Sequence, residues 1–245
     1  MAAYEDDTLV AGTECAARLR AQFADLDTQE IMRRAIEDLF PGRIALVSSF
    51  GADSAVLLHM VAQIDKTTPV LFIDTRVLFA ETLAYRDELV AHLGLSNIIT
   101  IGPKSARLAA EDPENFLWAS NPGRCCEIRK VLPLGEALEG YDAWISGRKR
   151  FQAHTRGALA LFESEGGRIK INPLAHWSAV KIRDYLDAFD LPRHPLVAKN
   201  YFSIGCIPCT SPVRPGEDPR AGRWRGSDKV ECGLHTLPLY AGLDI

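Results

Sequence analysis

The sequence predicts an α/β fold, a parallel sheet flanked by helices, because short apolar runs alternate with helical patterns. Four runs have the length and composition of buried strands, at residues 44–47, 70–73, 98–101 and 143–146. Helical patterns follow the first two runs, over residues 55–62 and 81–93. Parallel neighbours need a long crossover, usually a helix, so this order is typical of βαβ units.

A further helix is expected over residues 27–40, ahead of the first strand. Asp27 and Glu30 have capping-box spacing, and Pro41-Gly42 ends the apolar periodicity. From about residue 201 the chain is rich in Pro, Gly and Arg and shows little periodicity. We therefore expect a single domain over residues 1–245, in which residues 201–245 form a loop-rich, mobile C-terminal segment.

The bulk composition excludes several classes of protein. The chain has 245 residues, of which 47% are hydrophobic, so it can bury a sizeable core. A net charge of -4 argues against a general nucleic-acid binder, which is usually strongly basic. The N-terminus lacks the pattern of a secretory signal, and no apolar run is long enough to span a membrane. We expect a cytoplasmic protein with reduced thiols, in which clustered cysteines bind metal or do chemistry.

The loop after the first strand, SSFGADS, has features of an anion site. It joins a strand to a helix, where backbone N–H groups favour an anion, and its serines add hydroxyl donors. It is neither a Walker loop nor a dinucleotide fingerprint. An ordinary serine-rich turn remains the alternative. The expected substrate-binding positions in this loop are Ser48, Ser49, Phe50, Gly51 and Ser54.

Four cysteines occur as two tight pairs far apart in the sequence. Cys125 and Cys126 are adjacent, and Cys206 and Cys209 form a C-x-x-C motif. Four thiolates suit either a structural zinc ion or an iron–sulfur cluster. A directly adjacent pair is awkward for zinc, so the spacing favours a [4Fe–4S] cluster, with zinc as the alternative. Cys15 stands alone and is assigned no role.

A sixth cysteine, Cys232, lies near the end in ECGLH, with His235 three residues later. An exposed thiolate in a polar tail can react, which makes Cys232 a candidate nucleophile. Neighbouring arginines would lower its pKa and Glu231 would raise it, so the sequence leaves its reactivity open.

Together these motifs resemble the assimilatory adenylyl-sulfate (APS) reductases, the iron–sulfur-containing branch of the PAPS/APS reductase family. The SSFGADS loop is similar to the phosphate-gripping loop of the adenine-nucleotide alpha hydrolases, whose fold the resemblance implies. The resemblance extends from about residue 45 to residue 235. The other matching segments are DT at 74–75, CCEIRK, SGRKR, INPL, SIGCIPCT, RAGRWRG and ECGLH.

The resemblance implies a thioredoxin-dependent oxidoreductase of sulfate assimilation, leading to cysteine. Cys232 would attack the sulfur of APS, release AMP and carry a thiosulfonate, from which thioredoxin (or glutaredoxin) would release sulfite. Such a tail must close on the substrate and then expose Cys232. The implied anion contacts are Lys130, Arg148, Arg220 and Arg223, and His235 is assigned to seating the closed tail. The resemblance leaves open whether the chain forms a homo-oligomer.

Two positions depart from the family pattern. Arg76 stands where a glycine is common after the DT pair, and Ala80 stands where a proline is common. The arginine could alter the turn or contact the nucleotide.

Three rival functions also follow from the sequence. A PAPS reductase would share ECGLH but typically lacks the four paired cysteines, although a dual-specificity enzyme stays open. An ATP-using tRNA-thiolating or amidating enzyme would carry SGGxDS. A zinc-stabilised binding module would make Cys232 incidental.

Overall fold

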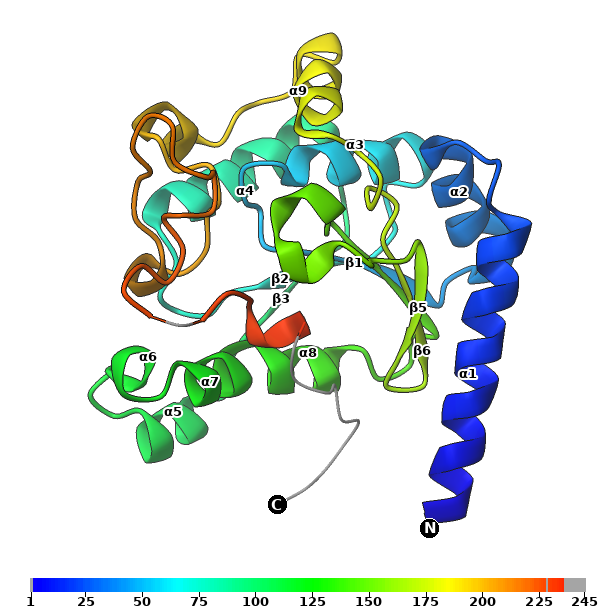
Figure 1. Cartoon of the computed structure of the whole chain (residues 1–245), viewed down its shortest axis with the longest axis horizontal. Coiled ribbons are helices and arrows are strands. Elements are labelled where there is room, and N and C mark those ends of the chain that lie inside the picture. Colours follow the sequence, from blue (N-terminus) through cyan, green and yellow to red (C-terminus); the bar gives the residue numbers. More distant parts are fainter. Residues whose placement is uncertain (1, 228, 236–245) are drawn as a thin grey trace.

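The computed structural model describes residues 2–227 and 229–235, with side chains from residue 12 and as far as residue 234. One six-stranded sheet, in the order β3-β2-β1-β4-β6-β5, forms the centre of the molecule (Figure 1). Neighbouring strands run parallel except β5, which pairs with β6 in the antiparallel sense. The strands are β1 (Ile44–Ser48), β2 (Val70–Ile73), β3 (Ile98–Ile101), β4 (Ala143–Ser146), β5 (Phe162–Glu165) and β6 (Arg168–Ile171).

Helices cover both faces of the sheet, as Figure 1 shows. The α-helices are α1 (Ala2–Gln22), α2 (Thr28–Arg34), α3 (Ser54–Ile64), α4 (Ala80–Leu93), α5 (Ser105–Glu111), α6 (Leu117–Ser120), α7 (Pro122–Cys126), α8 (Leu132–Ala137) and α9 (Ala179–Ala188). Two π-helical turns are η1 (Ala35–Leu39) and η2 (Glu127–Val131), and short 3₁₀ turns are η3 (Arg150–Gln152), η4 (His154–Arg156), η5 (Pro195–Lys199), η6 (Ile207–Cys209) and η7 (Gly233–His235).

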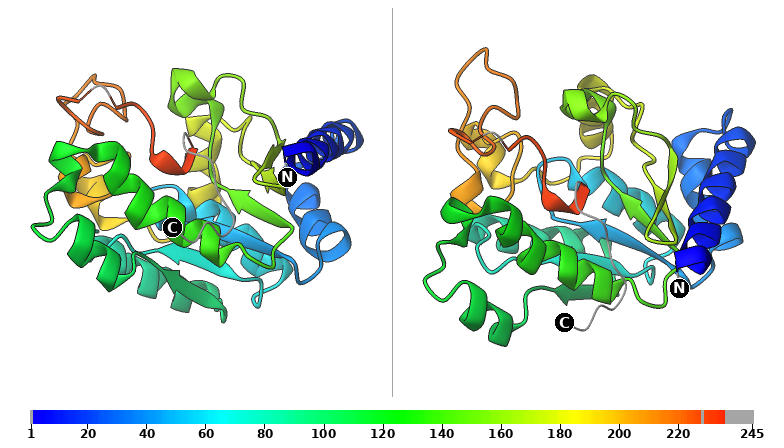
Figure 2. Two further views of the ribbon diagram at one scale, coloured as in Figure 1. Left: turned by 90° about the horizontal axis from the view of Figure 1, so that it is seen from below. Right: turned by 60° about the horizontal axis from the view of Figure 1, so that its bottom comes forward.

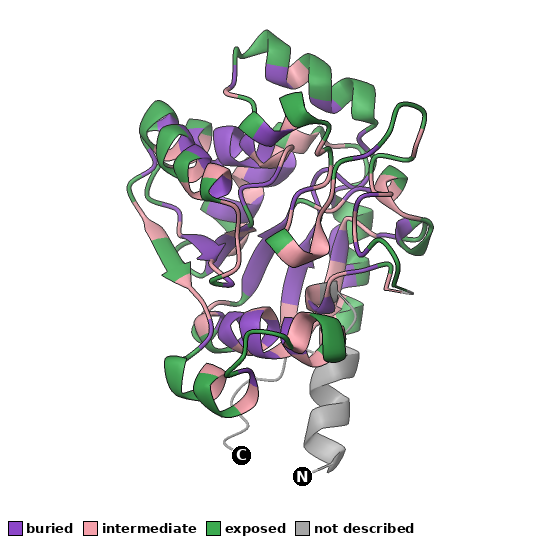
Figure 3. Cartoon of the chain, turned by 90° about the vertical axis from the view of Figure 1, so that its left-hand side faces the viewer, coloured by how far each residue is buried: buried purple, intermediate pink, exposed green. Residues whose placement is uncertain are grey.

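Two apolar clusters fix these layers. The larger one joins α2, α3, α4 and α9 to one face of the sheet through residues such as Met32, Leu58 and Phe72. The smaller one joins α8 to the opposite face through residues such as Leu134 and Trp144. The central strands are buried between the two, as Figure 3 shows. Strands buried on both faces read as continuous apolar runs, which is why the sequence reveals them.

The four strands and three helices expected from the sequence are confirmed. Asp27 caps α2 by accepting a hydrogen bond from the Glu30 N–H at 2.9 Å, and the expected helix continues through η1 to Leu39. The hairpin of β5 and β6 was not expected. Its turn carries the Gly166-Gly167 pair at φ of 59° and 75°, a dipeptide that is a hairpin signal in the sequence. The sheet is therefore mixed at this edge.

From Tyr201 to His235 the described chain contains turns and short 3₁₀ segments, as expected for a loop-rich C-terminal segment. Its last described turn, η7, returns across the molecule and packs against α7 and η2 (Figure 2). Whether this segment is mobile stays a prediction. Within the described residues, the helices lack the length and apolar composition needed to cross a lipid bilayer.

Candidate active site

A cavity of about 230 Å³ opens beyond the carboxyl ends of β1 and β4. The sheet order reverses here, because β1 pairs with β2 on one side and with β4 on the other. In open α/β sheets, ligands bind at such a switch point. The cavity wall includes the loop after β1, the loop after β4 and parts of the C-terminal segment. The topology thus brings three distant parts of the sequence to one site.

The loop after β1 presents Ser48, Ser49, Gly51 and Ser54 to this cavity. Phe50 turns the loop at a φ of 47°, and its N–H donates to the Ser48 Oγ at 3.2 Å. The Phe50 ring is fully buried against Phe72 in the core and does not line the cavity. The expected role of Phe50 in substrate binding is therefore not a side-chain contact here; the ring anchors the loop that carries the serines.

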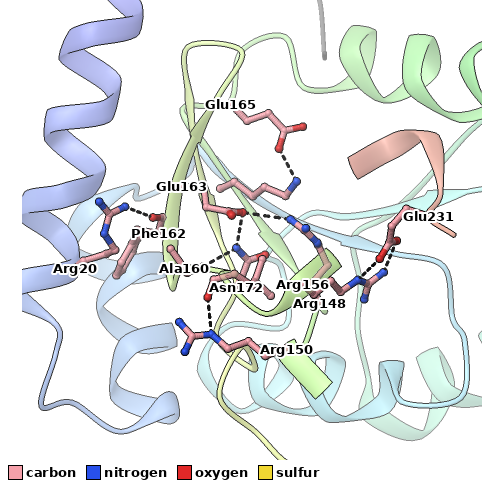
Figure 4. Close-up of polar contacts among 12 residues, drawn as sticks. Arg20, Arg148, Arg150, Arg156, Ala160, Phe162, Glu163, Glu165, Asn172 and Glu231 are labelled. Atoms are coloured by element: carbon pink, nitrogen blue, oxygen red, sulfur yellow. Dashed lines mark hydrogen bonds and ion pairs between the residues drawn. The ribbon is translucent and has the colours of Figure 1, made fainter. Parts of the chain in front are cut away.

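The cavity wall carries six cationic side chains, four of which pair with carboxylates, three of them within 3.3 Å and Arg220 at 3.7 Å. Lys149 Nζ donates to Asp53 Oδ2 at 2.8 Å, which ties the loop after β4 to the loop after β1. Arg148 Nη1 lies 3.3 Å from Glu163 Oε2 on β5 (Figure 4). Burial lowers the pKa of both Lys149 and Arg148. These pairs fix the shape of the wall.

The third pair joins the wall to the C-terminal segment. Arg156, from η4, binds both carboxylate oxygens of Glu231, with Nε donating at 2.6 Å and Nη2 at 2.8 Å (Figure 4). Both residues are buried, which is rare for charged groups that lack a partner. This bidentate contact fixes the residue immediately before Cys232.

Two further cations come from the C-terminal segment itself. The Arg223 guanidinium lies 4.3 Å from the centroid of the Trp224 ring and donates from Nε to the Cys209 carbonyl at 3.2 Å. A Cβ on Gly205 would lie 2.5 Å from Arg223 Nη2, so glycine leaves the space that the guanidinium occupies. Arg220 lies 3.7 Å from Glu231 and is partly buried, and burial lowers its pKa to about 10. Both side chains line the cavity.

Lys130 is the sixth cation, and it meets Cys232. Cys125, Cys126 and Lys130 lie on one continuous helical segment formed by α7, η2 and α8, with the π-helical turn over residues 127–131. Lys130 Nζ is 3.4 Å from Cys232 Sγ. Burial alone would lower the pKa of Lys130, but the charges of Cys206, Cys232 and Cys126 raise it well above its usual value. Lys130 therefore stays cationic beside the thiol.

Cys126 also meets Cys232. A hydrogen bond from the Cys232 thiol lowers the pKa of Cys126 to about 5 and raises that of Cys232 to about 12. On its other side, Cys126 Sγ accepts a hydrogen bond from Lys229 Nζ at 3.1 Å. The two sulfur atoms thus lie between two lysines, Lys130 beside Cys232 and Lys229 beside Cys126.

The four paired cysteines converge on this side of the cavity. The charges of Cys206 and Cys209 act on Cys125, and burial raises the pKa of Cys125 and of Cys209. The Thr75 hydroxyl, at the end of β2, lies 3.2 Å from Cys206 Sγ. The Arg129 guanidinium donates to the Thr75 carbonyl at 2.8 Å and so ties the two segments together. The fold therefore brings both pairs into one neighbourhood.

The four side chains of this group are all thiols, which are the ligands of an iron–sulfur cluster. Among the side chains described, no three His, Cys, Asp or Glu residues have the geometry to hold one metal ion. Thiol-only donors beside Lys130 and Arg129 suit a group that carries negative charge. Cys126 would have to turn from Cys232 to act as the fourth ligand.

The two departures from the family pattern have local explanations. Arg76 adopts a φ of 62°, the left-handed region that favours glycine, and its N–H donates to Asp74 Oδ1. Its guanidinium donates to Ser105 Oγ at 3.0 Å and does not line the cavity. Ala80 is the first residue of α4, a position that suits proline equally well. Arg76 therefore keeps a turn conformation that favours glycine, and its side chain is directed away from the cavity.

The cavity brings together Cys232, Lys130, Arg148, Arg220, Arg223 and Cys206 with the serines and Gly51 of the first loop. The side chain of His235 lies outside the described residues, so its expected seating role stays a prediction. The wall also contains Asp53, Lys149 and Arg156, and Glu231 anchors the C-terminal segment; none of these roles was predicted from the sequence. Asp53, Lys149 and Glu231 stand inside the quoted motifs, but nothing in the sequence indicates which acid pairs with which base.

Comparison with known proteins gives a consistent result. Residues 43–212 match the model of the phosphoadenosine phosphosulfate reductase domain. The chain is 55% identical to an adenosine 5'-phosphosulfate reductase of Mesorhizobium japonicum, over 93% of this chain and 90% of that protein. It is 41% identical to the corresponding protein of Mycolicibacterium smegmatis, over 91% and 94%. A phosphoadenosine 5'-phosphosulfate reductase of Gloeobacter violaceus is 39% identical, over 89% and 92%.

Solved structures agree on the fold. The crystal structure of a phosphoadenylyl-sulfate (PAPS) reductase from Candida auris, a phosphate complex, has a TM-score of 0.70 and 28% identity, covering 82% of this chain and 97% of that one. Yeast FAD synthetase has a TM-score of 0.51 at 17% identity, covering 83% of this chain and 76% of that one, a likeness of fold alone. These structures confirm the expected adenine-nucleotide alpha hydrolase-like architecture.

Proposed function

Because the chain belongs to the phosphoadenosine phosphosulfate reductase domain family, we propose that it reduces adenosine 5'-phosphosulfate (APS) to sulfite and AMP, as a step in sulfate assimilation. The observation that carries this proposal is the contact between Cys232 and Lys130, 3.4 Å apart, in a cationic cavity at the end of β1. A nucleophilic thiol, a cation and a nucleotide-type loop are what thiol attack on an anionic nucleotide requires.

The reaction is proposed to run in two displacement steps. The Cys232 thiolate attacks the sulfate sulfur of APS, the bond from that sulfur to the bridging oxygen breaks, and AMP leaves with the electron pair. Cys232 then carries a thiosulfonate. A thiolate of the reductant attacks the Cys232 sulfur, and sulfite leaves. A second thiol of the reductant resolves the mixed disulfide, so two thiols supply the two electrons and Cys232 returns as a thiol.

The residues divide these tasks between them. The hydroxyls of Ser48, Ser49 and Ser54 suit the phosphate, since they line the cavity at the start of α3. Lys130 neutralises the sulfate and stabilises the Cys232 thiolate. Arg148, Arg220 and Arg223 contribute positive charge along the wall, and guanidinium groups suit oxyanions. Repulsion between the thiolate and the anionic substrate is thereby offset.

We further propose that Cys125, Cys126, Cys206 and Cys209 hold a [4Fe–4S] cluster. When bound, it would supply a fixed negative charge beside Lys130 rather than the electrons of the reaction. Bringing the Cys126 thiolate into such a ligand set would free Cys232 from its hydrogen bond with Cys126. Lys130 would then be the nearest charged partner of Cys232.

Thioredoxin is the proposed reductant, with glutaredoxin as the alternative, because the second step needs a dithiol. Such a protein must reach Cys232, which is only partly exposed at the cavity wall. The segment that carries Cys232 would therefore open after the first step. This is the reason to expect residues 201–245 to be mobile.

A specific feature of the wall favours APS over PAPS. Lys149, Arg148 and Arg156 are each already paired with a carboxylate. PAPS carries an additional 3'-phosphate, which would need cationic partners beyond those that the phosphosulfate uses. The relative named phosphoadenosine 5'-phosphosulfate reductase keeps PAPS as the second candidate substrate.

The test is sulfite release by anaerobically purified protein with reduced thioredoxin, comparing initial rates on APS and PAPS. A strong preference for APS supports the proposal. Equal or faster turnover of PAPS would retain the Cys232 chemistry and contradict the proposed substrate. The absence of sulfite from both would contradict the proposed activity.

A further inference from the structure

Glu231 is a buried carboxylate beside the proposed nucleophile, yet it does not act on that thiol in the structure. Its side chain is 4% exposed. Both of its oxygens accept hydrogen bonds from Arg156, at 2.6 and 2.8 Å (Figure 4). Its Oε1 also accepts one from the Thr155 hydroxyl at 3.2 Å. Because these donors occupy both oxygens, Glu231 is not placed as a proton acceptor for Cys232.

A carboxylate immediately before Cys232 is electrostatically unfavourable for a nucleophilic thiolate. Its negative charge next to Cys232 opposes formation of the thiolate. Burial raises the pKa of Glu231, but the hydrogen bond and charge of Arg156 outweigh burial and lower the pKa below its usual value. The group therefore stays ionised, and its ionised form is committed to Arg156.

Arg156 is itself held firmly by the wall of the cavity. Its Nη1 donates to Gln152 Oε1 at 2.5 Å, and its backbone N–H donates to the Ala153 carbonyl at 2.9 Å. The guanidinium lines the cavity. Glu231 is thus attached to the wall that would face a bound nucleotide.

Further residues before and after Cys232 are attached as well. Lys229 Nζ donates to the Pro122 carbonyl at 2.7 Å, at the start of α7, and to Cys126 Sγ at 3.1 Å. Leu234 packs against the smaller apolar cluster. Cys232 therefore lies between two attached residues, Glu231 at η4 and Leu234 at the smaller apolar cluster, and Lys229 attaches the preceding chain to α7.

We propose that Glu231 is a positioning residue, whose ion pair with Arg156 holds Cys232 Sγ beside Lys130 for attack on the substrate. The same ion pair must open before a partner protein can reach Cys232. This inference rests on the proposed function, because it takes Cys232 to be the nucleophile. It adds to that function a residue that sets the geometry through Arg156 and touches neither substrate nor the reacting atoms.

Two variants separate the length of the side chain from its charge. Glu231→Gln keeps the size and removes the charge, whereas Glu231→Asp keeps the charge and shortens the reach to Arg156. Glu217→Gln is the matched control, because Glu217 pairs with Arg225 at 2.8 Å on the exposed part of the same C-terminal segment. All three are made in the full chain and purified anaerobically.

The first readout is the rate at which iodoacetamide alkylates Cys232, followed by peptide mass spectrometry across pH. The rate constant of the thiolate, obtained by fitting the pH dependence and called the limiting rate, reports access, and the fitted midpoint reports the pKa of Cys232. We expect the limiting rate to rise about tenfold in both Glu231 variants and to stay unchanged in Glu217→Gln. A limiting rate within about twofold of wild type in both Glu231 variants would overturn the inference.

The second readout is a single turnover with APS in the absence of reductant. Both Glu231 variants should form the Cys232 adduct at least about tenfold more slowly, although the thiol is more accessible, because its geometry is lost. AMP affinity should not weaken. Unchanged adduct formation would contradict the positioning role. If Cys232→Ser retained sulfite release, the proposed function would fail, whereas the alkylation result would still report the attachment of the segment.

Discussion

Lys130 Nζ lies 3.4 Å from Cys232 Sγ, although the two residues are 102 positions apart in the chain. The contact depends on two independent features of the fold. The helical segment 122–137 places Lys130 on the face that bears Cys126, and η7 packs against that segment. The fold thereby holds the Lys130 cation next to the Cys232 thiol, which the sequence alone indicates only as a candidate nucleophile.

Replacing Lys130 with methionine should slow formation of the Cys232 adduct by about 10²–10³-fold, because one preorganised charge at a developing anion has about that effect. The measurement is a single turnover with APS. Lys104→Met is the matched control, since Lys104 is exposed and pairs with Glu136 at 2.9 Å. Equal rates for Lys130→Met and wild type would contradict the role of Lys130.

Arg223→Lys should lower kcat/KM for APS by about tenfold or more, because an ammonium group cannot bind an oxyanion in a bidentate manner or reproduce the contact with the Trp224 ring. Arg225→Lys is the neighbouring control, since Arg225 is exposed and pairs with Glu217. An equal kcat/KM for Arg223→Lys and Arg225→Lys would contradict the proposed role of Arg223.

Anaerobically purified protein should contain about four iron and four labile sulfide per chain. Cys125→Ser, Cys206→Ser and Cys209→Ser should each lose most of the iron, whereas Cys15→Ser should retain it. Cys15 serves as the control because it lies on α1, against the larger apolar cluster. Stoichiometric zinc without sulfide would favour the alternative that the sequence left open.

The attachment of the C-terminal segment should depend on pH through Glu231. Its pKa in the closed form lies below the ordinary value of 4.5, so the ion pair contributes its full stability above that pH. The contribution is lost as the pH falls toward the lowered pKa, by up to about tenfold in the opening equilibrium per pH unit. Amide hydrogen exchange over residues 229–235 should show this loss in wild type. Glu231→Gln should lack it, and an equal loss in that variant would contradict the assignment.

Of the four strands that the sequence predicted, β1, β2 and β4 are buried on both faces, whereas β3 is an apolar but partly exposed edge strand. The runs 44–47 and 70–73 are continuous and apolar because helices cover both sides of the sheet. β5 and β6 lie toward one edge and carry no such run, because RIKI alternates polar with apolar residues and FESE contains a single apolar residue. Their Gly166-Gly167 turn was the signal that remained in the sequence.

The parts of the site that could be predicted are those in which a residue type and its spacing in the sequence indicate the chemistry. Cysteine pairs, the serine loop and Cys232 have recognisable spacing, and Cys232 indeed lies in one cavity with the serine loop. The pairs Lys149–Asp53 and Arg156–Glu231 join residues 96 and 75 positions apart. The sequence does not indicate such pairings, because each basic residue could pair with many different carboxylates until the fold places the two together.

If Cys232 attacks the sulfur of APS, the mass of the protein itself should report the step. Anaerobic protein is incubated with APS without any thiol, and the intact chain and its peptides are weighed. We expect the peptide that contains Cys232 to gain one SO₃ group and to lose it when reduced thioredoxin is added. The Cys232→Ser variant should show no gain. An unmodified chain that nevertheless releases sulfite once thioredoxin is present would contradict it.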